Sequence, residues 1–279
     1  MKKFTKLMAL VLSVAMLATC FVACGGNENK NEAPTTTPTT TPATTPATTA
    51  PAGTGEKTVL KMGTNAYFPP YEYYDGQTIV GIDAEIAKAI ADKLGMELEI
   101  VDMSFESIIS AVNSGIVDFG MAGMTVNADR LKDVDFTTSY AKGVQAVIVK
   151  EGSAITTVDD LDADGASYKI GVQLGTTGDA YASEDFGADR VTQYQTGNEA
   201  VQALLKGDVD CVIIDNEPAK SYVNANEGTK VLETTYADED YAICVKKGNS
   251  ELLQKLDAAI YELTKDGTIA SIVAKYIKD

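Results

Sequence analysis

The chain has 279 residues, 45% of them hydrophobic, a formal net charge of -17 and no histidine. This length can bury the core of one large domain or of two lobes. Without histidine, Ser-His-Asp and Cys-His catalytic arrangements and histidine-based metal sites are excluded. The acidic charge argues against a nucleic-acid partner, because phosphate binding needs a basic face.

The N-terminus has the pattern of an export signal. Three lysines precede an apolar run from residue 7 to 23. The sequence FVAC, which ends at Cys24, resembles a bacterial lipoprotein signal, although Phe21 departs from the usual aliphatic residue. We predict a signal peptide over residues 1–23 and lipidation of Cys24. Cys20 is the alternative acceptor, and a retained membrane anchor is the alternative to cleavage.

Residues 24–56 are rich in threonine, proline and alanine and contain no large apolar side chain. Such a segment cannot bury enough surface to offset the entropy lost on ordering. We predict a semi-rigid tether between a membrane anchor and a globular domain. Loss of the three lysines of the signal would lower the formal charge from -17 to -20.

Strands and helices alternate from residue 57 onward. Apolar runs at residues 58–64, 96–103 and 116–123 predict strands, and residues 81–95 and 106–115 predict helices.

The helix predicted at residues 81–95 has a regular apolar face. That face consists of Ile82, Ile86, Ile90 and Leu94. Asp83 is the expected N-cap, and Gly95 is expected to end the helix.

Two stretches of the chain resemble each other. SAVNSGIVDFGM at residues 110–121 aligns with QALLKGDVDCVI at residues 202–213, and KMGT at Lys61 is echoed by KIGV at Lys169. Because both pairs occur in the same order at similar spacing, we predict a parallel α/β unit in each half of the chain. Two lobes of similar build follow from this.

The segments that follow the predicted strands are candidate binding loops, because ligands of open parallel sheets lie beyond the carboxyl ends of the strands. These segments are residues 65–68, 123–130, 173–177 and 215–217. If the loops face one another across two lobes, they line a cleft.

Arg130 lies in a loop that can bind a carboxylate. Asn127 can cap a short helix there, whose free N–H groups and dipole attract an anion. Thr125 adds a hydroxyl donor, and an arginine can bind a carboxylate through two parallel hydrogen bonds. The chemistry leaves open the alternative that Arg130 pairs with Asp129 or Asp133 on the surface.

Asp215 ends the apolar run DCVIID, where a carboxylate could bind an ammonium group. The alternative left open is that Asp215 caps the helix that begins at Glu217.

Aromatic residues gather in NAYFPPYEYYDG, residues 65–76, and Phe105 follows another predicted strand. Aromatic rings on two sides of a cleft would hold the apolar or planar part of a small ligand. Some of these rings are expected to pack the edge of the lobe instead.

Other chemical signals are weak. The chain has no G-x-x-x-x-G-K-[ST] phosphate loop, and GVQLGTTGD lacks dinucleotide-binding spacing. Cys211 and Cys244 lie in apolar runs and are predicted to be buried free thiols, with a disulfide as the alternative.

From residue 58 to the C-terminus, the chain resembles the extracellular solute-binding proteins of bacterial ABC importers for polar amino acids. The motifs occur in family order: GTNAYFPPYEY, GIDAEIAKAIADKLG, DMSFESIISAVNSGIVDFGMAGMTVNADR, VDFTTSY, IGVQLGTTGDAY, DVDCVIIDNEP, YAICVKKGN and LTKDGTIASIVAKYI.

The resemblance implies an α/β, two-lobed periplasmic-binding-protein fold of type II with a hinge and an interlobe cleft. Residues 57–140 and 241–279 would form the first lobe and residues 141–240 the second, with crossovers near 140–144 and 236–241. The protein would be a monomer at the extracellular face of the cell membrane, held there by its N-terminal lipid. It would deliver a small amino acid to ABC permease subunits.

The resemblance also implies a set of ligand-binding residues, with no metal, cofactor or catalytic residue. They are Asn65, Phe68, Phe105, Gly123, Thr125, Arg130, Gln173, Thr176 and Asp215. In this reading Arg130 holds the α-carboxylate of the ligand, with help from Thr125 and the backbone around Gly123.

The other lobe would complete the site. Thr176 would add donors, and Asp215 would bind the α-ammonium group. Phe68 and Phe105 would sandwich the side chain of the ligand.

Specificity is expected from Asn65, Gln173 and Ile214, because relatives often carry charged or ionisable residues at these positions. A neutral pocket would leave a charged side chain buried without a partner, at a high energetic cost. We therefore expect a neutral polar ligand. A basic amino acid is the alternative, because Glu72 could reach the pocket. An enzyme similar to cyclohexadienyl dehydratases and an adhesin or sensor module are the alternatives of other classes.

Overall fold

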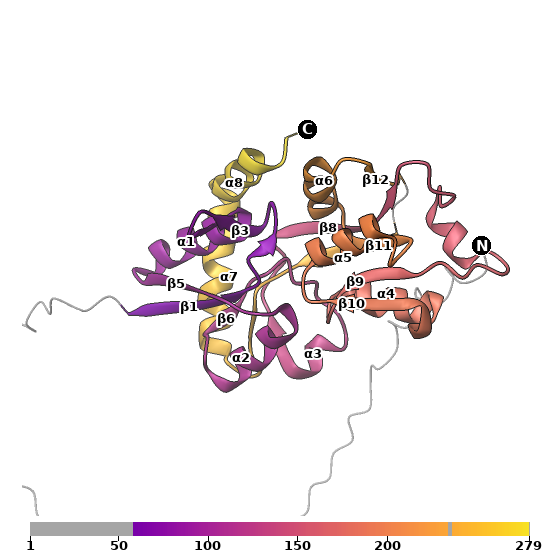
Figure 1. Cartoon of the computed structure of the whole chain (residues 1–279). Coiled ribbons are helices and arrows are strands. Elements are labelled where there is room, and N and C mark those ends of the chain that lie inside the picture. Colours follow the sequence, from indigo (N-terminus) through magenta and orange to yellow (C-terminus); the bar gives the residue numbers. More distant parts are fainter. Residues whose placement is uncertain (1–57, 234–235, 279) are drawn as a thin grey trace, which may run out of the picture. The chain divides into compact units, whose positions relative to one another are not determined.

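The computed structural model describes residues 58–278 apart from residues 234 and 235 (Figure 1). The predicted signal peptide, Cys24 and the tether lie outside these residues. Within the described part, no helix has both the length and the apolar character needed to cross a membrane.

The first lobe contains a five-stranded sheet with the order β5-β1-β6-β14-β7. Its strands are β1 (Val59–Thr64), β5 (Glu97–Asp102), β6 (Phe119–Gly120), β7 (Val134–Phe136) and β14 (Cys244–Lys246). β1 pairs in parallel with β5 and β6, whereas β14 pairs antiparallel with β6 and β7. A smaller sheet has the order β2-β3-β4, with β2 (Tyr67–Phe68), β3 (Glu72–Asp75) and β4 (Thr78–Val80).

The second lobe contains a sheet with the order β10-β9-β11-β8-β12, and β13 also pairs with β8. The strands are β8 (Ala141–Lys150), β9 (Ile170–Gln173), β10 (Val191–Tyr194), β11 (Cys211–Asp215), β12 (Thr229–Val231) and β13 (Ala237–Tyr241). β9 pairs in parallel with β10 and β11, and β8 runs antiparallel to its neighbours.

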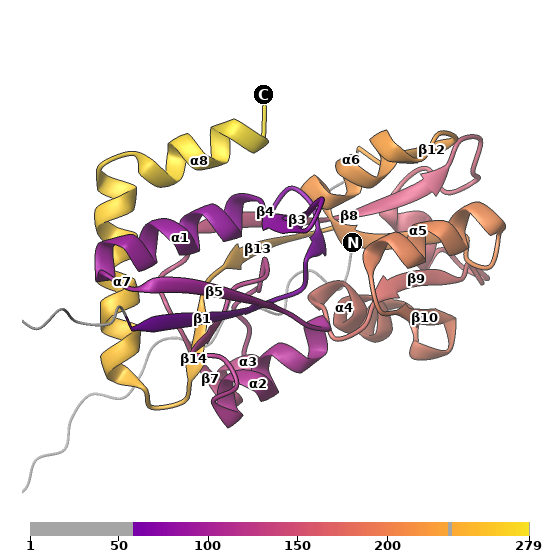
Figure 2. The ribbon, with the colours of Figure 1, turned by 60° about the vertical axis from the view of Figure 1, so that its left-hand side comes forward.

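Helices cover both sheets (Figure 2). They are α1 (Ile82–Leu94), α2 (Ile108–Ser114), α3 (Arg130–Asp133), α4 (Thr177–Phe186), α5 (Gly197–Lys206), α6 (Asn216–Ala225), α7 (Ser250–Lys265) and α8 (Thr268–Tyr276). Three 3-10 turns are η1 (Phe105–Ser107), η2 (Val158–Asp162) and η3 (Ala188–Arg190). In the first lobe, α7 and α8 at the end of the chain pack against α1.

Helix α1 forms as its apolar spacing predicted, but its start differs from the prediction. Ile82, Ile86 and Ile90 are fully buried, and Gly95 ends the helix in a left-handed conformation. Gly81, not Asp83, is the N-cap. The side chain of Asp83 is instead fully buried and is directed away from its own helix to more distant partners.

The internal repeat is confirmed in atomic detail. The carboxylate of Asp118 accepts a hydrogen bond from the backbone N–H of Lys61 (2.7 Å), and that of Asp210 accepts one from Lys169 (2.8 Å). In each lobe this contact precedes the parallel pairing of the two strands concerned, β1 with β6 and β9 with β11. The matching glycine–aspartate pattern therefore reflects two α/β units built alike.

The chain crosses between the lobes along β8 and β13. These strands pair antiparallel, with Ala141 opposite Tyr241 and Gln145 opposite Ala237. The crossovers predicted near residues 140–144 and 236–241 coincide with these strands, whereas the lobe boundaries drawn from them stay a prediction.

Cys211 and Cys244 are free and fully buried, which confirms the prediction of unpaired thiols. Burial raises the pKa of each thiol to about 12. Both side chains therefore behave as small apolar residues of the core.

Candidate ligand-binding site

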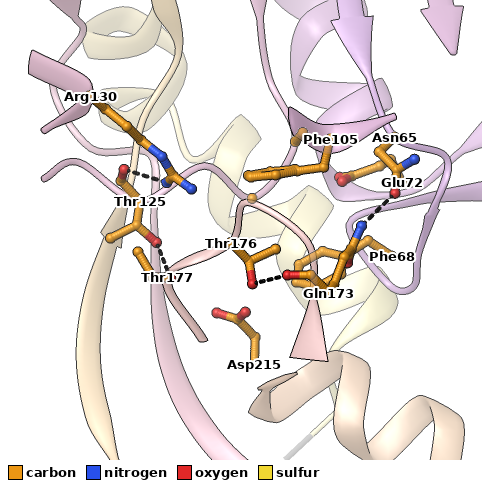
Figure 3. Close-up of a pocket in the computed structure, with 12 residues that line it drawn as sticks. Asn65, Phe68, Glu72, Phe105, Thr125, Arg130, Gln173, Thr176, Thr177 and Asp215 are labelled. Atoms are coloured by element: carbon orange, nitrogen blue, oxygen red, sulfur yellow. Dashed lines mark hydrogen bonds between the residues drawn. The ribbon is translucent and has the colours of Figure 1, made fainter. Parts of the chain in front are cut away.

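A pocket of about 290 Å³ lies between the two lobes (Figure 3). Its lining residues are Asn65, Phe68, Glu72, Phe105, Ala122, Gly123, Thr125, Arg130, Gln173, Thr176, Thr177 and Asp215. The nine predicted ligand-binding residues are all in this set. Glu72, Ala122 and Thr177 were not among them.

The lining residues come from the carboxyl ends of parallel strands. Asn65 follows β1, Gly123 lies three residues after β6, and Phe105 lies three residues after β5. From the second lobe, Gln173 ends β9 and Asp215 ends β11. Two sheets that point their carboxyl ends at each other thus bring five separate loops to one pocket.

Arg130 is a buried cation, with 9% of its surface exposed. Its Nη1 donates to the carbonyl of Thr125 (2.8 Å), and its Nη2 donates across the pocket to the carbonyl of Gly175 (3.1 Å). The guanidinium carbon lies 5.2 Å from the centre of the Phe105 ring. Further N–H groups of the guanidinium remain for a ligand, because arginine carries five.

The surface ion pair considered for Arg130 does not form. Asp129 pairs with Lys132 instead, and Arg130 takes part in no ion pair within the described residues. Asp129, not Asn127, is the N-cap residue of the short helix α3. The Oδ1 of Asn127 nevertheless accepts a hydrogen bond from the backbone N–H of Arg130, the first residue of that helix (2.8 Å). The buried guanidinium thus carries a positive charge without a carboxylate partner in the described part.

Threonines from both lobes flank Arg130. The hydroxyl groups of Thr125 and Thr177 lie 3.4 Å apart across the pocket. Thr176 is the N-cap of α4, where its hydroxyl accepts from the backbone N–H of Asp179 (3.3 Å) and donates to the carbonyl of Gln173 (2.8 Å). The N-terminus of a ten-residue helix therefore opens at this wall of the pocket and favours an anion there.

Asp215 is 6% exposed and its carboxylate points toward the pocket (Figure 3). It occupies the N-cap position of α6, but its side chain makes no capping hydrogen bond. The hydroxyl of Tyr241 donates to Oδ1 of Asp215. Asp215 is therefore the N-cap residue of α6, as the alternative proposed, but its carboxylate does not cap the helix and is directed to the pocket.

Gly123 is held by Asp83. Its backbone N–H donates to Oδ2 of Asp83 (2.8 Å), so this N–H is not free for a ligand. Tyr140, at the start of the crossover, donates its hydroxyl to the same oxygen (2.7 Å). Gly123 has φ +53°, and a Cβ there would come within 2.8 Å of the ring of Phe68. Only glycine fits both the backbone conformation and the space.

Glu72 brings an unpaired carboxylate to the pocket. The residue is fully buried, and neither carboxylate oxygen has a hydrogen-bond partner within the described residues. It lies on β3 opposite Phe68 of β2. Burial, followed by the charge of neighbouring Asp83, raises the pKa of Glu72 well above its usual value. Strand geometry directs Glu72 and Tyr73 to opposite faces of β3, but EYYD shows no alternation of polar and apolar residues that would mark Glu72 as the buried one.

Asn65 and Gln173 are joined across the pocket. Nε2 of Gln173 donates to Oδ1 of Asn65 (2.9 Å), while Nδ2 of Asn65 donates to the carbonyl of Met103 (2.9 Å). Ile214, the third residue on which the specificity argument rested, does not line the pocket. It is buried in the hydrophobic core with Tyr222. The reason is strand alternation, because neighbouring residues of β11 face opposite sides of the sheet and Asp215 faces the pocket.

Buried carboxyl groups outnumber buried cations around the pocket. Glu72, Asp83, Asp215 and Glu239 are all below 9% exposed, and Arg130 is the buried cation beside them. Burial raises the pKa of Asp83 to about 6, against the opposing effect of hydrogen bonds from Gly123 and Tyr140. Burial also lowers the pKa of Arg130, although arginine stays protonated in proteins. In the described residues these acids form no cluster arranged to hold a metal ion.

Comparisons with known proteins agree on one family. The model of the bacterial extracellular solute-binding proteins, family 3, matches residues 60–279. The chain is 29% identical to the arginine-binding extracellular protein ArtP of Bacillus subtilis (strain 168), over 96% of each chain.

Solved structures share both fold and sequence with this chain. An ancestral arginine-binding protein bound to glutamine is 40% identical with a TM-score of 0.75, covering 81% of this chain and all of the other. An ancestral arginine-binding protein bound to arginine is 41% identical with a TM-score of 0.73, covering 79% of this chain and 99% of the other. These matches confirm the predicted two-lobed fold class.

Proposed function

Because the chain belongs to the bacterial extracellular solute-binding proteins of family 3, we propose that it binds one polar amino acid between its lobes and delivers it to an ABC permease. One observation carries this proposal. A single buried pocket presents a guanidinium from the first lobe, Arg130, and a carboxylate from the second, Asp215. A zwitterion offers the complementary pair of charges.

The α-carboxylate of the ligand binds beside Arg130. The guanidinium already has fixed hydrogen bonds to two backbone carbonyls, so little side-chain entropy is lost when the ligand arrives. Thr125 adds a hydroxyl, and the N-terminus of α4 at Thr177 adds a favourable dipole.

The α-ammonium group binds at Asp215. One oxygen of this carboxylate is held by the Tyr241 hydroxyl, which fixes its orientation. The other oxygen faces the cavity. A charge-assisted hydrogen bond in this buried position is stronger than one in water.

Two classes of ligand side chain each have an observation in their favour. The amide pair Asn65–Gln173 supports a neutral polar side chain, since amides can both donate to and accept from another amide. Glu72 supports a basic side chain, because its buried oxygens lack partners. The ancestral relatives bound to glutamine and to arginine are consistent with either class.

Closure of the lobes accompanies binding. Two hydrogen bonds support this, since Gln173 contacts Asn65 and Arg130 contacts Gly175 across the pocket. A ligand that touches both lobes favours the closed state, because some of its contacts exist only there. The closed form would dock on the permease at the extracellular face of the membrane, where the lipid on Cys24 would retain a monomer.

Isothermal titration of the purified chain with L-glutamine, L-arginine, L-lysine and L-histidine tests the proposal. We expect a single site for at least one of them. If none of the common amino acids binds, the proposed function is contradicted. Turnover of prephenate or arogenate would then support the dehydratase alternative.

Glu72→Gln separates the two side-chain classes. If the ligand is basic, this substitution removes its buried partner, which costs on the order of 2–5 kcal/mol. If the ligand is neutral, the affinity changes little. Glu97→Gln on β5 is the matched control, since Glu97 is exposed and distant from the pocket lining.

A further inference from the structure

Glu239 is a buried acid that does not line the pocket. It lies on the crossover strand β13 (Figure 2) and is 4% exposed. Its Oε2 accepts a hydrogen bond from Nε2 of Gln145 (2.9 Å), whereas its Oε1 is buried with no hydrogen-bond partner within the described residues. The ligand-binding role assigned to the pocket leaves this side chain unexplained.

The strand register places Glu239 on the same face of the sheet as Asp215, with Gln145 of β8 between them. Gln145 of β8 lies opposite Asp215 on one side and opposite Ala237 on the other. Glu239 is two residues beyond Ala237, so all three polar side chains share one face of the sheet. In agreement with this placement, burial and then the charge of Glu239 raise the pKa of Asp215 well above its usual value.

Few groups near this pair can offset two negative charges. The titratable groups and the amide that face it are Tyr241 on the same strand as Glu239, Gln145 on β8, Tyr181 on α4, and Tyr71, Glu72 and Arg130 from the first lobe. Arg130 is the cation of this set, and two of its hydrogen bonds go to backbone carbonyls. Glu72 adds a further acid.

Two buried acceptor oxygens beside this pair have no hydrogen-bond donor within the described residues. Oε1 of Glu239 and Oε1 of Gln145 are both buried acceptors without a partner. Two ionised carboxylates would leave these acceptors unsatisfied and would repel each other. One carboxylic O–H in the pair supplies a donor and removes one of the charges.

We propose that Glu239 is a positioning residue of the ammonium site: beside it, Asp215 retains its proton in the empty pocket, and the α-ammonium group of the ligand displaces that proton. This inference rests on the proposed function. The proton leaves the carboxyl oxygen as the ammonium N–H groups take its place, and it passes to solvent buffer. The charge around Asp215 is conserved, because the ligand ammonium group replaces one proton, and the ligand carboxylate is balanced separately by the guanidinium of Arg130.

Titration calorimetry in phosphate and in Tris, which differ in ionisation enthalpy, measures this release directly. With L-arginine and L-glutamine as probes at pH 6.5, we expect about one proton released per ligand bound. Across pH 5.5–7, where both probes keep their ammonium group, the affinity should rise by up to about tenfold per pH unit. An enthalpy independent of the buffer and an affinity independent of pH would overturn the inference.

Glu239→Gln tests the role of Glu239. The variant keeps an acceptor for Gln145 and removes the charge of Glu239, whereas the burial of Asp215 remains. We expect proton release to fall below that of the unmodified chain while binding is retained. Asp240→Asn is the matched control, because Asp240 is the exposed neighbour on β13 that pairs with Lys142, and its proton release should equal that of the unmodified chain.

The outcomes separate the two proposals. If neither probe nor any other common amino acid binds the unmodified chain, the proposed function fails. If binding occurs and Glu239→Gln releases as many protons as the unmodified chain, only the role of Glu239 is refuted. If the variant does not fold, the buffer and pH dependence of the unmodified chain still decides whether a proton is displaced.

Discussion

Gln173 and Asn65, 108 residues apart in the chain, share a hydrogen bond of 2.9 Å that joins the two lobes across the pocket. Each side chain is almost fully buried, and each follows or ends a parallel strand of its own lobe. If the lobes separate as we propose, this bond breaks. It would then couple the pocket wall to the closed state.

Gln173→Ala should weaken ligand binding by about 5- to 30-fold, since one buried hydrogen bond contributes about 1–2 kcal/mol. Calorimetry with whichever amino acid binds gives the affinity. Gln202→Ala is the control, because Gln202 donates a similar bond to Asn226 (2.8 Å) and neither residue lines the pocket. Equal effects of the two substitutions would contradict the coupling.

Arg130→Ala should lower affinity by on the order of 2–5 kcal/mol, because it removes a buried charge that the ligand carboxylate would contact. Arg130→Lys should recover only part of this loss, since an ammonium group cannot form the bidentate contact. Binding is measured by calorimetry, and folding by circular dichroism. Unchanged affinity in Arg130→Ala would refute the assignment of this residue.

Arg190 offers a contrast to Arg130. Its guanidinium donates to the carbonyls of Tyr168 (3.0 Å) and Leu161 (2.9 Å) in the second lobe, away from the pocket lining. We expect Arg190→Ala to lower the melting temperature and to leave the affinity nearly unchanged.

The stability of the ligand-free protein should fall as the pH rises from about 4 to about 7. The pKa of Asp83 is raised to about 6 from 3.8, so the folded chain binds this proton more tightly than the unfolded chain. The stabilisation is complete below the unfolded pKa and is lost as the pH rises through the folded one. For Asp83 alone the loss is on the order of 3 kcal/mol.

Other acids limit this trend at low pH. Lys247 and the N–H of Gly248 lower the pKa of Asp135, and hydrogen bonds from Thr156 lower that of Asp160. Their stabilisation is lost as the pH falls below about 4. Urea unfolding at pH 4.5, 6 and 7.5 should therefore give the highest free energy of unfolding at the lowest of these values. A steady rise toward pH 7.5 would contradict the buried-acid account.

Gly143→Ala should destabilise the protein and disturb Asp215. A Cβ at residue 143 would lie 2.4 Å from the ring of Tyr241, whose hydroxyl holds the Asp215 carboxylate. Overpacking of a rigid core site costs about 1–3 kcal/mol. Gly171→Ala on β9 is the milder control, since its nearest contact would be 3.2 Å. We expect Gly143→Ala to lower the melting temperature and the ligand affinity more than Gly171→Ala does.

Local sequence patterns were sufficient to predict much of the fold. The apolar spacing of Ile82, Ile86 and Ile90 predicted α1, and Gly95 marked its end. The repeated glycine–aspartate pattern predicted two like units, which Asp118 and Asp210 confirm through equivalent bonds. Helix α1 depends on residues close in sequence, and the two α/β units depend on a repeat within the chain. Both can therefore be recognised from a single sequence.

Asp83 and Ile214 mark where this reasoning failed. Asp83 resembled a helix cap, but a partner 40 residues away competes for its carboxylate. Ile214 stood beside a pocket residue in sequence, and strand alternation turned it into the core. The direction of the Asp83 side chain depended on partners distant in the chain, which the local sequence does not specify. The direction of Ile214 follows from strand alternation once Asp215 is placed in the pocket.

The sequence by itself determined the alternation of strands and helices, the two related lobes and the loops that follow the strands, because these depend on local periodicity and turn chemistry. Only the tertiary structure decided that Arg130 is buried without a carboxylate partner among the described residues, that Glu72 lines the pocket, and that Glu239 is buried on the same face of the sheet as Asp215. Burial and charge proximity arise between segments distant in the chain. They set the protonation and the hydrogen-bonding capacity of the site, and no local pattern encodes them.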